Sequence, residues 1–258
     1  CSEITLPTGI DKDGRDRTAV CCLSSLNLEK YDEWKDDEKM LDDVMRFLDN
    51  VLSDFIKRAP EQFSDATYAA EKERSVGLGV MGFHSFLQKN NIPLESVMSK
   101  AWNKKIFKKI QEGVDQASKD LAEERGACPD AAEYGFNERF SNKTAIAPTA
   151  SISVICGGAS PGVEPVAANS YTHKTLSGSF NVRNRYLVDI LENYGKNTDD
   201  VWSTITNNQG SVSHLDFLTA LEKDVFKTAF ELDQKWIIEL SGDRTPFISQ
   251  AQSVNLFL

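Results

Sequence analysis

Long amphipathic helices separated by short apolar runs fill this sequence, and that alternation constrains its fold more than any other feature. Between residues 36 and 58, apolar side chains recur at three- and four-residue steps and Pro60 follows, which predicts a helix. A second long helix is predicted over 94–125, with Gly126 placed to end it. Further helices are predicted over 184–194, 198–206 and 214–240.

The segments between the helices read as strands and turns. We predict a buried strand over 18–23, a tight turn or hairpin at Asp13-Gly14, and a glycine-rich entry into a helix that ends near Asn90. The last stretch, ISQAQSVNLFL, predicts a strand, and its uncapped end leads us to expect an interrupted chain. Together these elements predict an α/β layer architecture in one domain, or in part of one.

Charge and composition exclude several classes of function. The 258 residues carry a net charge of -10, which argues against binding nucleic acid through bulk electrostatics. The sequence has no run of 18 apolar residues and no basic, apolar leader, so we expect no membrane span, no signal peptide and a cytoplasmic location. Five scattered cysteines and three separated histidines predict neither a disulfide framework nor a metal site.

Residues 144–182 hold almost no charge and are dense in Gly, Ala, Ser, Thr and Pro. Within them a short strand leads into Pro148, Thr149, Ala150, Ser151, Ile152 and Ser153. If a helix begins there, its free N–H groups would form an anion pocket. The alternative is an ordinary helix cap beside a buried glycine turn. The spacing fits neither a Walker loop nor a dinucleotide fingerprint.

The cysteines give a second set of candidates. Cys128 and Cys156 are interpreted as packing residues, whereas Cys21 and Cys22 should point to opposite faces, one into the core and the other free to react. Cys1 and Glu3 would project to the same side of an extended segment. A thiol beside a carboxylate suits a nucleophile with its base, or a hydrogen-abstracting thiol with a proton shuttle. The alternative is an arbitrary chain start without a role.

Five segments, in this order, resemble the large catalytic subunit of class I ribonucleotide reductase. They are CSEITLPT with AVCCLSSLNL, RSVGLGVMGF, ERGACP, APTAS and SPGVEP. Each motif alone is weak, but five in the family's order span nearly the whole chain. Ser2 before Glu3 favours class I, because Cys-Gly-Glu is more usual in the cobalamin-dependent class.

The resemblance implies a fold and a role for each candidate. The fold would be part of the family's ten-stranded α/β barrel, rich in helices. Cys1 would become the thiyl radical that removes the 3′ hydrogen of the ribose, and Glu3 would take the proton of the 3′ hydroxyl. Cys21, rather than Cys22, would be one of two cysteines that reduce the 2′ position. Residues 148–153, together with Cys1, Ser2 and Glu3, would bind a ribonucleoside diphosphate.

The resemblance also implies partners. A metal-containing small subunit would supply the radical, and thioredoxin or glutaredoxin would supply reducing equivalents, with no cofactor or metal in this chain. The second cysteine of the redox pair, the effector site, the tyrosine pair and the tail cysteines of the family are not in this sequence. We therefore expect residues 1–258 to be the second half of the catalytic barrel domain, inactive alone. A start at Cys1 suits an intein or split gene, or a cloning boundary.

Two other functions remain open at this point. One is a cysteine-dependent acyl-transfer enzyme in which Cys1 is the nucleophile and its own α-amino group is the base. The other is a non-catalytic interaction domain that keeps the barrel's core and binds no phosphate at 148–153.

Overall fold

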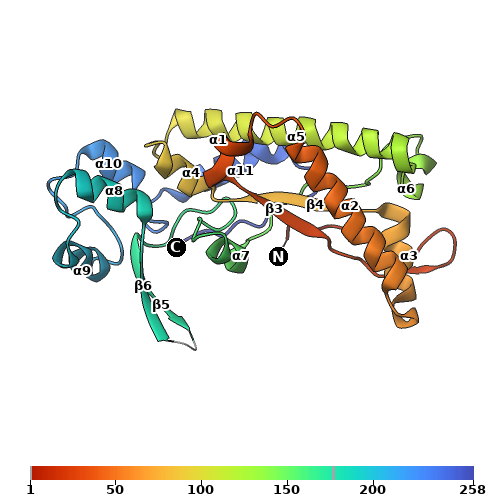
Figure 1. Ribbon diagram of the computed structural model, residues 1–258, viewed down its shortest axis with the longest axis horizontal. Helices are drawn as coiled ribbons and strands as arrows, with labels where there is room; N and C mark the ends of the chain where they lie inside the picture. The colour runs from red at the N-terminus through yellow and green to blue at the C-terminus, as the bar shows by residue number, and fades with distance from the viewer. Residues whose placement is uncertain (1, 176–177) are drawn as a thin grey trace.

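The computed structural model describes residues 2–175 and 178–258. The molecule is elongated, with its longest helix running along one side (Figure 1). The helices are α1 (Tyr31–Trp34), α2 (Met40–Arg58), α3 (Ser64–Glu73), α4 (Phe83–Lys89), α5 (Val97–Arg125), α6 (Pro129–Glu133), α7 (Ala150–Ile155), α8 (Arg185–Asn193), α9 (Asp199–Asn207), α10 (Ala220–Val225) and α11 (Gln234–Arg244). The strands are β1 (Gly9–Ile10), β2 (Asp16–Arg17), β3 (Leu23–Asn27), β4 (Gly77–Met81), β5 (Ser170–Thr175) and β6 (Gly178–Arg183).

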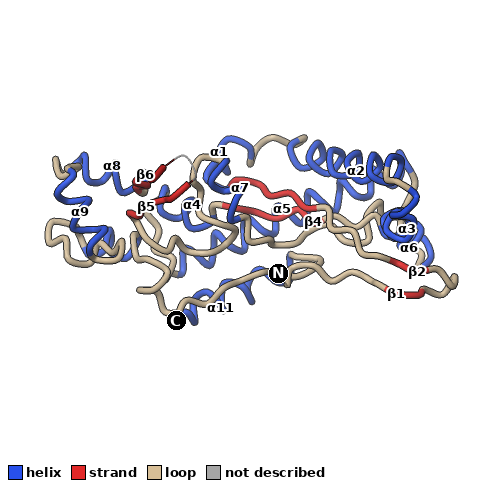
Figure 2. Tube along the Cα trace, turned by 90° about the horizontal axis from the view of Figure 1, so that it is seen from below, coloured by secondary structure: helices blue, strands red, loops and turns tan. Residues whose placement is uncertain are grey.

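Parallel extended segments form the centre of the molecule. β3 pairs in parallel with β4, from Leu23 opposite Gly77 to Asn27 opposite Met81. Parallel bridges then join Leu78 to Thr144, and Ile146 to Gln252. The spatial order is therefore β3, β4, 144–146 and the segment around 252, with helices in the connections. In Figure 2 the strand beside the labelled β4, in the middle of the molecule, is β3. This arrangement is the α/β layering that the sequence predicted.

Gly79 explains how closely these segments approach. A side chain on Gly79 would collide with the carbonyl oxygen of Ala145 in the neighbouring segment. Only glycine therefore lets the 144–146 segment lie against β4 at this distance. The glycine-rich run of the sequence is thus a fully buried strand, and α4 follows it as predicted.

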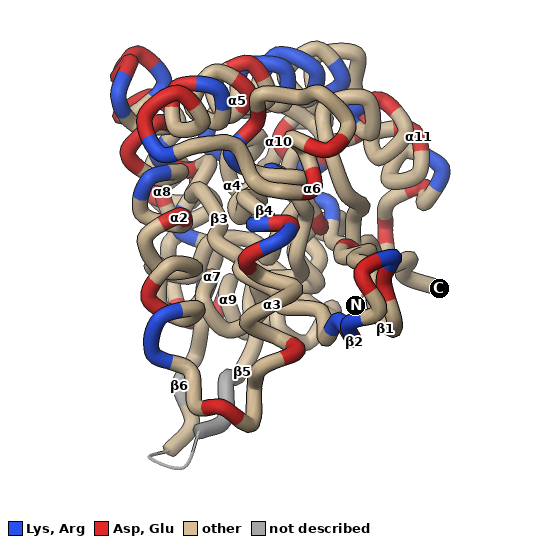
Figure 3. Tube along the Cα trace, turned by 90° about the vertical axis from the view of Figure 1, so that its right-hand side faces the viewer, with Lys and Arg blue, Asp and Glu red and all other residues tan. Residues whose placement is uncertain are grey.

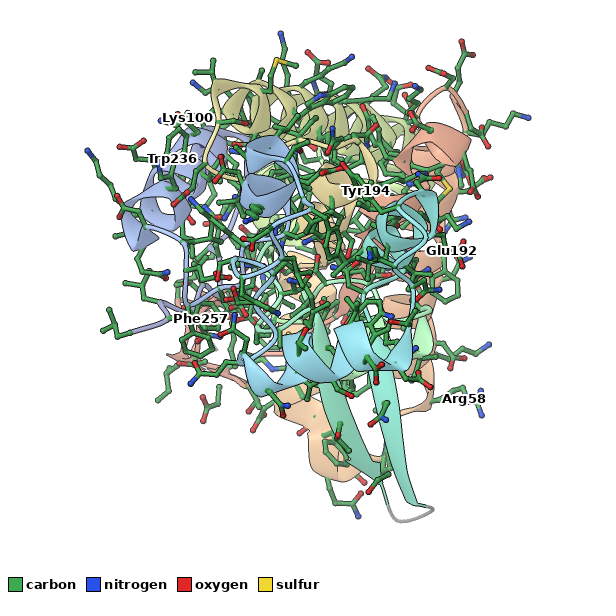
Figure 4. The ribbon with its side chains drawn as sticks, turned by 90° about the vertical axis from the view of Figure 1, so that its left-hand side faces the viewer. Arg58, Lys100, Glu192, Tyr194, Trp236 and Phe257 are labelled. Carbon is green, nitrogen blue, oxygen red and sulfur yellow. The ribbon has the colours of Figure 1, made fainter. Side chains whose placement is uncertain are left out.

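The core lies between the parallel segments and the helices α2 and α5. α5 buries Ile106, Phe107, Ile110 and Val114, which pack in one cluster with side chains of α2, β3 and β4. Each such side chain contributes roughly 1.5–3 kcal/mol through burial. α11 packs beside α5, and Lys100 lies 4.9 Å from the ring centre of Trp236 (Figure 4). α5 thus covers one side of the strands, while α7 and the N-terminal loop lie on the other side (Figure 1).

A smaller unit with its own apolar cluster occupies one end of the molecule (Figure 1). Its helices α8, α9 and α10 surround Trp202, Ile205 and Leu187, which are at most 2% exposed. The antiparallel pair β5–β6 projects beside it. The sequence analysis identified α8 and α9 but did not predict this hairpin, because its residues lie within the weakly patterned 144–182 stretch.

Other predictions of individual elements were partly wrong. The predicted strand at 18–23 begins only at Leu23, because pairing starts where β4 starts, at Gly77. The predicted helix over 214–240 is two helices, since Thr219 caps α10 and Asp233 caps a new start for α11. The final stretch forms one bridge, at Gln252, and no regular strand.

The hairpin at Asp13-Gly14 and the long helix that ends at Gly126 are confirmed. α3 was not predicted. Acidic and basic residues intermingle over α5 and α11 (Figure 3). Across the described residues, no helix combines the length and the apolar character needed to cross a membrane.

Candidate active site

Glu3 is a buried carboxylate on an extended loop beside the last part of the chain. Its residue is 5% exposed, and the hydroxyl of Ser253 donates a hydrogen bond to its Oε2 atom. Its backbone carbonyl accepts a hydrogen bond from the N–H of Ala251, with an N–O distance of 3.0 Å. Among the described residues, no Lys or Arg forms an ion pair with Glu3. The carboxylate is thus fixed in place by neutral groups.

Cys21 lies close enough to Glu3 for the two to interact electrostatically. The residue is exposed and lies two positions before the start of β3. The pKa of the Cys21 thiol is raised above its usual range, first by desolvation and second by the negative charge of Glu3. The thiol therefore keeps its proton at neutral pH. The structure brings together two of the three predicted catalytic residues, and Cys1 lies outside the described residues.

Cys22 is less exposed than Cys21 and packs against the main core cluster. Its thiol pKa is raised by burial and by its neighbour Cys21. One cysteine of the pair therefore contacts the core while the other stays accessible, as the sequence predicted. Cys128 is 0% exposed, which confirms its packing role. The packing role predicted for Cys156 is wrong, because Gly157 and Gly158 turn the chain at the end of α7 and leave Cys156 exposed.

Residues 148–153 form a turn followed by the short helix α7. Thr149 adopts a left-handed backbone (φ 56°) and does not cap the helix with its side chain. Instead, its hydroxyl accepts a hydrogen bond from the N–H of Gly162, at 2.7 Å. The first N–H groups of α7 therefore have no side-chain cap, as an anion pocket requires.

The hydroxyls of this loop differ in accessibility. Ser153 is 2% exposed and its hydroxyl donates to the carbonyl of Ala150 at 3.3 Å, so it faces the protein. Ser151 is exposed, and so are Ala150 and Ile152. Pro148 is half-buried and leads into the turn. Of the three hydroxyls, the one free to meet a ligand is that of Ser151, since Thr149 and Ser153 hold the loop together.

Two further residues complete the site, and the sequence analysis did not identify them. Ser253 contacts Glu3, and Asn255 donates to Glu164 both from its backbone N–H (3.0 Å) and from its side chain (2.8 Å). Glu164 is 6% exposed and lies in the SPGVEP motif that was recognised. Neither Ser253 nor Asn255 stands out in the sequence, because the alternation of polar residues over 250–255 gave no sign of the partners that they would meet.

No group of three or more His, Cys, Asp or Glu side chains that could hold a metal ion occurs among the residues that the structure describes. The structure brings the Glu3 carboxylate near the protonated Cys21 thiol, and it leaves the first N–H groups of α7 without a side-chain cap. These groups can exchange a proton, donate a hydrogen from sulfur and bind an anion.

Comparison with known proteins identifies the family. The family model described as "Ribonucleotide reductase, barrel domain" matches residues 1–138 and 130–258. The ribonucleoside-diphosphate reductase large subunit of Invertebrate iridescent virus 6 is 51% identical over the whole chain, which covers 27% of that relative. The corresponding subunit of Invertebrate iridescent virus 3 is 44% identical, with 40% of its length covered.

Among solved structures, the class Id ribonucleotide reductase alpha subunit of Actinobacillus ureae superimposes with a TM-score of 0.89 at 39% identity. The match covers all of this chain and 46% of that one. The chain thus spans less than half the length of each of these three relatives. The predicted fold class, part of a ten-stranded α/β barrel, is confirmed. The chain belongs to the ribonucleotide reductase barrel-domain family.

Proposed function

We propose that this chain forms the later part of the catalytic barrel of a ribonucleoside-diphosphate reductase, which makes deoxyribonucleotides for DNA synthesis. The observation that carries the proposal is the buried carboxylate of Glu3, which lies near enough to Cys21 to raise the pKa of its thiol. The names of the viral relatives support the same activity.

The chemistry assigns one task to each group. The Cys1 thiyl radical takes the 3′ hydrogen atom, and Glu3 accepts the proton of the 3′ hydroxyl, which assists loss of the 2′ hydroxyl as water. Two thiols then supply two electrons and become a disulfide. Cys1 finally returns its hydrogen to the 3′ carbon. Cys21 suits the reducing step because its raised pKa keeps the hydrogen on sulfur. Its partner cysteine lies outside this sequence.

The substrate's diphosphate would bind at the start of α7. The uncapped N–H groups of this turn and the Ser151 hydroxyl would donate hydrogen bonds to the phosphate oxygens. Thr149 would act indirectly, by holding the turn against Gly162. We assign Cys1, Ser2, Glu3 and residues 148–153 to substrate binding on this basis.

The reaction needs two partners that this chain does not contain. A metal-containing small subunit would generate the radical, and thioredoxin or glutaredoxin would reduce the disulfide after each turnover. The cytoplasm is the compartment where such reductants operate. The described part of the chain supplies the proton acceptor, one reducing thiol and the phosphate loop.

The test is titration of a ribonucleoside diphosphate into this chain joined to the upstream and downstream segments that its relatives possess. We expect Ser151→Ala to weaken binding about 10-fold, the loss typical of one hydrogen bond to a charged group. Ser141→Ala, an exposed serine outside the loop, is the matched control. Cys1→Ser should bind normally and abolish turnover with the small subunit.

Three outcomes would contradict the proposal. Absence of diphosphate binding in the joined protein would favour a non-catalytic interaction domain. Labelling of Cys1 by a thioester-forming substrate analogue would favour acyl transfer. Turnover by residues 1–258 alone, with a small subunit, would show that the missing half of the redox pair is not needed.

A further inference from the structure

The chain segment 250–255 lies along the loop that carries Glu3. The N–H of Thr5 donates to the side-chain oxygen of Gln250 at 3.0 Å, and the N–H of Ala251 donates to the carbonyl of Glu3 at 3.0 Å. The N–H of Ser2 donates to the hydroxyl oxygen of Ser253 at 2.9 Å. Three contacts, at nearly every step of the loop, therefore fix it to this segment.

Ser253 makes the contact that reaches the carboxylate. It is 9% exposed, and its hydroxyl meets both the backbone N–H of Ser2 and the Oε2 atom of Glu3. A serine hydroxyl has one hydrogen to donate and lone pairs to accept. Because the Ser2 N–H can only donate, it takes a lone pair, and the single hydroxyl hydrogen goes to Glu3. The direction of the bond is thus determined by its surroundings.

We propose that Ser253 is the positioning residue for the catalytic carboxylate. It holds one oxygen of Glu3, so that the other is left to accept the substrate's proton, and the same atom anchors the residue that follows Cys1. Ser253 itself touches no reacting atom. This inference rests on the proposed function, because it assumes that Glu3 is the proton acceptor.

Removing the hydroxyl frees the carboxylate to rotate and loosens the loop. We expect kcat to fall by about 10- to 100-fold, because the lost hydrogen bond held a charged group in the orientation that the reaction needs. The phosphate loop, which is assigned the diphosphate, is left unchanged by this substitution, so the KM should rise by a much smaller factor than that by which kcat falls. A general loss of structure would instead alter both constants.

The experiment compares Ser253→Thr with Ser253→Val in the joined protein with its small subunit. The two side chains have the same shape and differ in the hydroxyl. We expect Thr to retain most of kcat and Val to lose it, with equal melting temperatures within a few degrees. Ser249→Ala is the control on the same segment, because the Ser249 hydroxyl accepts from the N–H groups of Lys143 and Thr144, away from Glu3.

A double variant separates positioning from structure. If Ser253 acts through Glu3, adding Ser253→Val to Glu3→Gln should cause no further loss of kcat. Losses that multiply would overturn the inference, and so would wild-type kcat in Ser253→Val. In both cases an inactive Cys1→Ser variant and a low but measurable kcat in Glu3→Gln would leave the proposed function intact. Cys1→Ser and Glu3→Gln variants with wild-type kcat would instead refute the proposed function.

Discussion

Asp49 and Glu3 are buried carboxylates in two different regions of the molecule, and the groups around them differ in charge. Asp49, on α2, is 0% exposed and contacts three guanidinium groups, those of Arg74 (2.6 Å), Arg125 (2.9 Å) and Arg139 (2.8 Å). Burial alone would raise the pKa of Asp49, but hydrogen bonds from Arg139 and the charge of Arg74 hold this pKa below its usual range. Glu3 has one hydroxyl partner for its carboxylate and no such cation among the described residues.

The difference separates structure from chemistry. A carboxylate surrounded by cations stays ionised, and Asp49 ties the middle of α2 to the C-terminal ends of α3 and α5 and to the loop at Arg139. Glu3 is held instead by a single hydroxyl, which fixes its orientation without a cation from the described residues. The Asp49 cluster is therefore a structural junction, whereas Glu3 makes no such junction and lies in the candidate active site.

The largest effect should come from neutralising the junction. We expect Asp49→Asn to lower the free energy of unfolding by about 3–5 kcal/mol, because it leaves the buried Arg74 and the half-buried Arg139 without their counter-charge. Urea denaturation measures this loss. Asp54→Asn, on the same helix, is the control, since its pair with Arg58 is exposed and should contribute less than about 1 kcal/mol. If Asp49→Asn lowers the free energy of unfolding no more than Asp54→Asn does, the Asp49 cluster is not a structural junction.

Glu73 is a third buried carboxylate to compare with Asp49 and Glu3. Neither an arginine nor a hydroxyl donates a hydrogen bond to it. It is 2% exposed, both of its oxygens lack a hydrogen-bond partner, and burial raises its pKa from 4.5 to about 7 despite the charge of Arg17. The protonated form is favoured in the folded protein. The stability it confers is complete below pH 4.5 and is lost as the pH rises through about 7.

This predicts a pH-dependent difference between the wild type and Glu73→Gln, whose side chain stays neutral. Relative to the variant, the wild type should lose about 3 kcal/mol of stability between pH 4.5 and pH 8. Thermal or urea unfolding across this range checks the prediction. A difference that is independent of pH would mean that Glu73 finds a partner when ionised.

The smallest effect concerns the charge of Glu3 on its neighbour. Glu3→Gln removes one of the two causes that raise the pKa of the Cys21 thiol, so more thiolate should be present at pH 8. We expect alkylation of Cys21 by iodoacetamide to become about two to three times faster, as followed by peptide mass spectrometry. Cys156, exposed and at the end of α7, is the internal reference. An equal rate in both proteins would place Glu3 too far from Cys21 for the proposed chemistry.

The sequence predicted the long elements of this molecule better than the short ones. α2 and α5 carry enough apolar repeats for their faces to be recognised, and Gly126 marks an end that the structure confirms. The break between Val225 and Gln234 was missed because apolar residues continue across it, and only the side-chain caps at Thr219 and Asp233 reveal two helices. In this region the side-chain caps determine where the helices begin, and the apolar periodicity alone does not.

The candidate site was predictable where motifs carried it and unpredictable where distant segments meet. Glu3, Cys21 and the loop at 148–153 came from recognisable stretches. Ser253 was missed because its partner lies about 250 positions away in the chain, a separation that no local pattern encodes. The hydroxyls of Thr149 and Ser153 could not be separated from that of Ser151 by sequence, since only the folded turn shows which of them faces inward.

The segment around Gln252 makes side-chain contacts on two opposite sides. Ser253 and Asn255, two residues apart, reach Glu3 and Glu164 on one side. Gln252, between Ala251 and Ser253, accepts from the guanidinium of the buried Arg244 on the other side. A register shift of one residue in this segment would turn each of these side chains to the opposite side and break all three contacts. Through this segment, the position of the Glu3 carboxylate is coupled to the packing of α11, and a shift of one would displace the other.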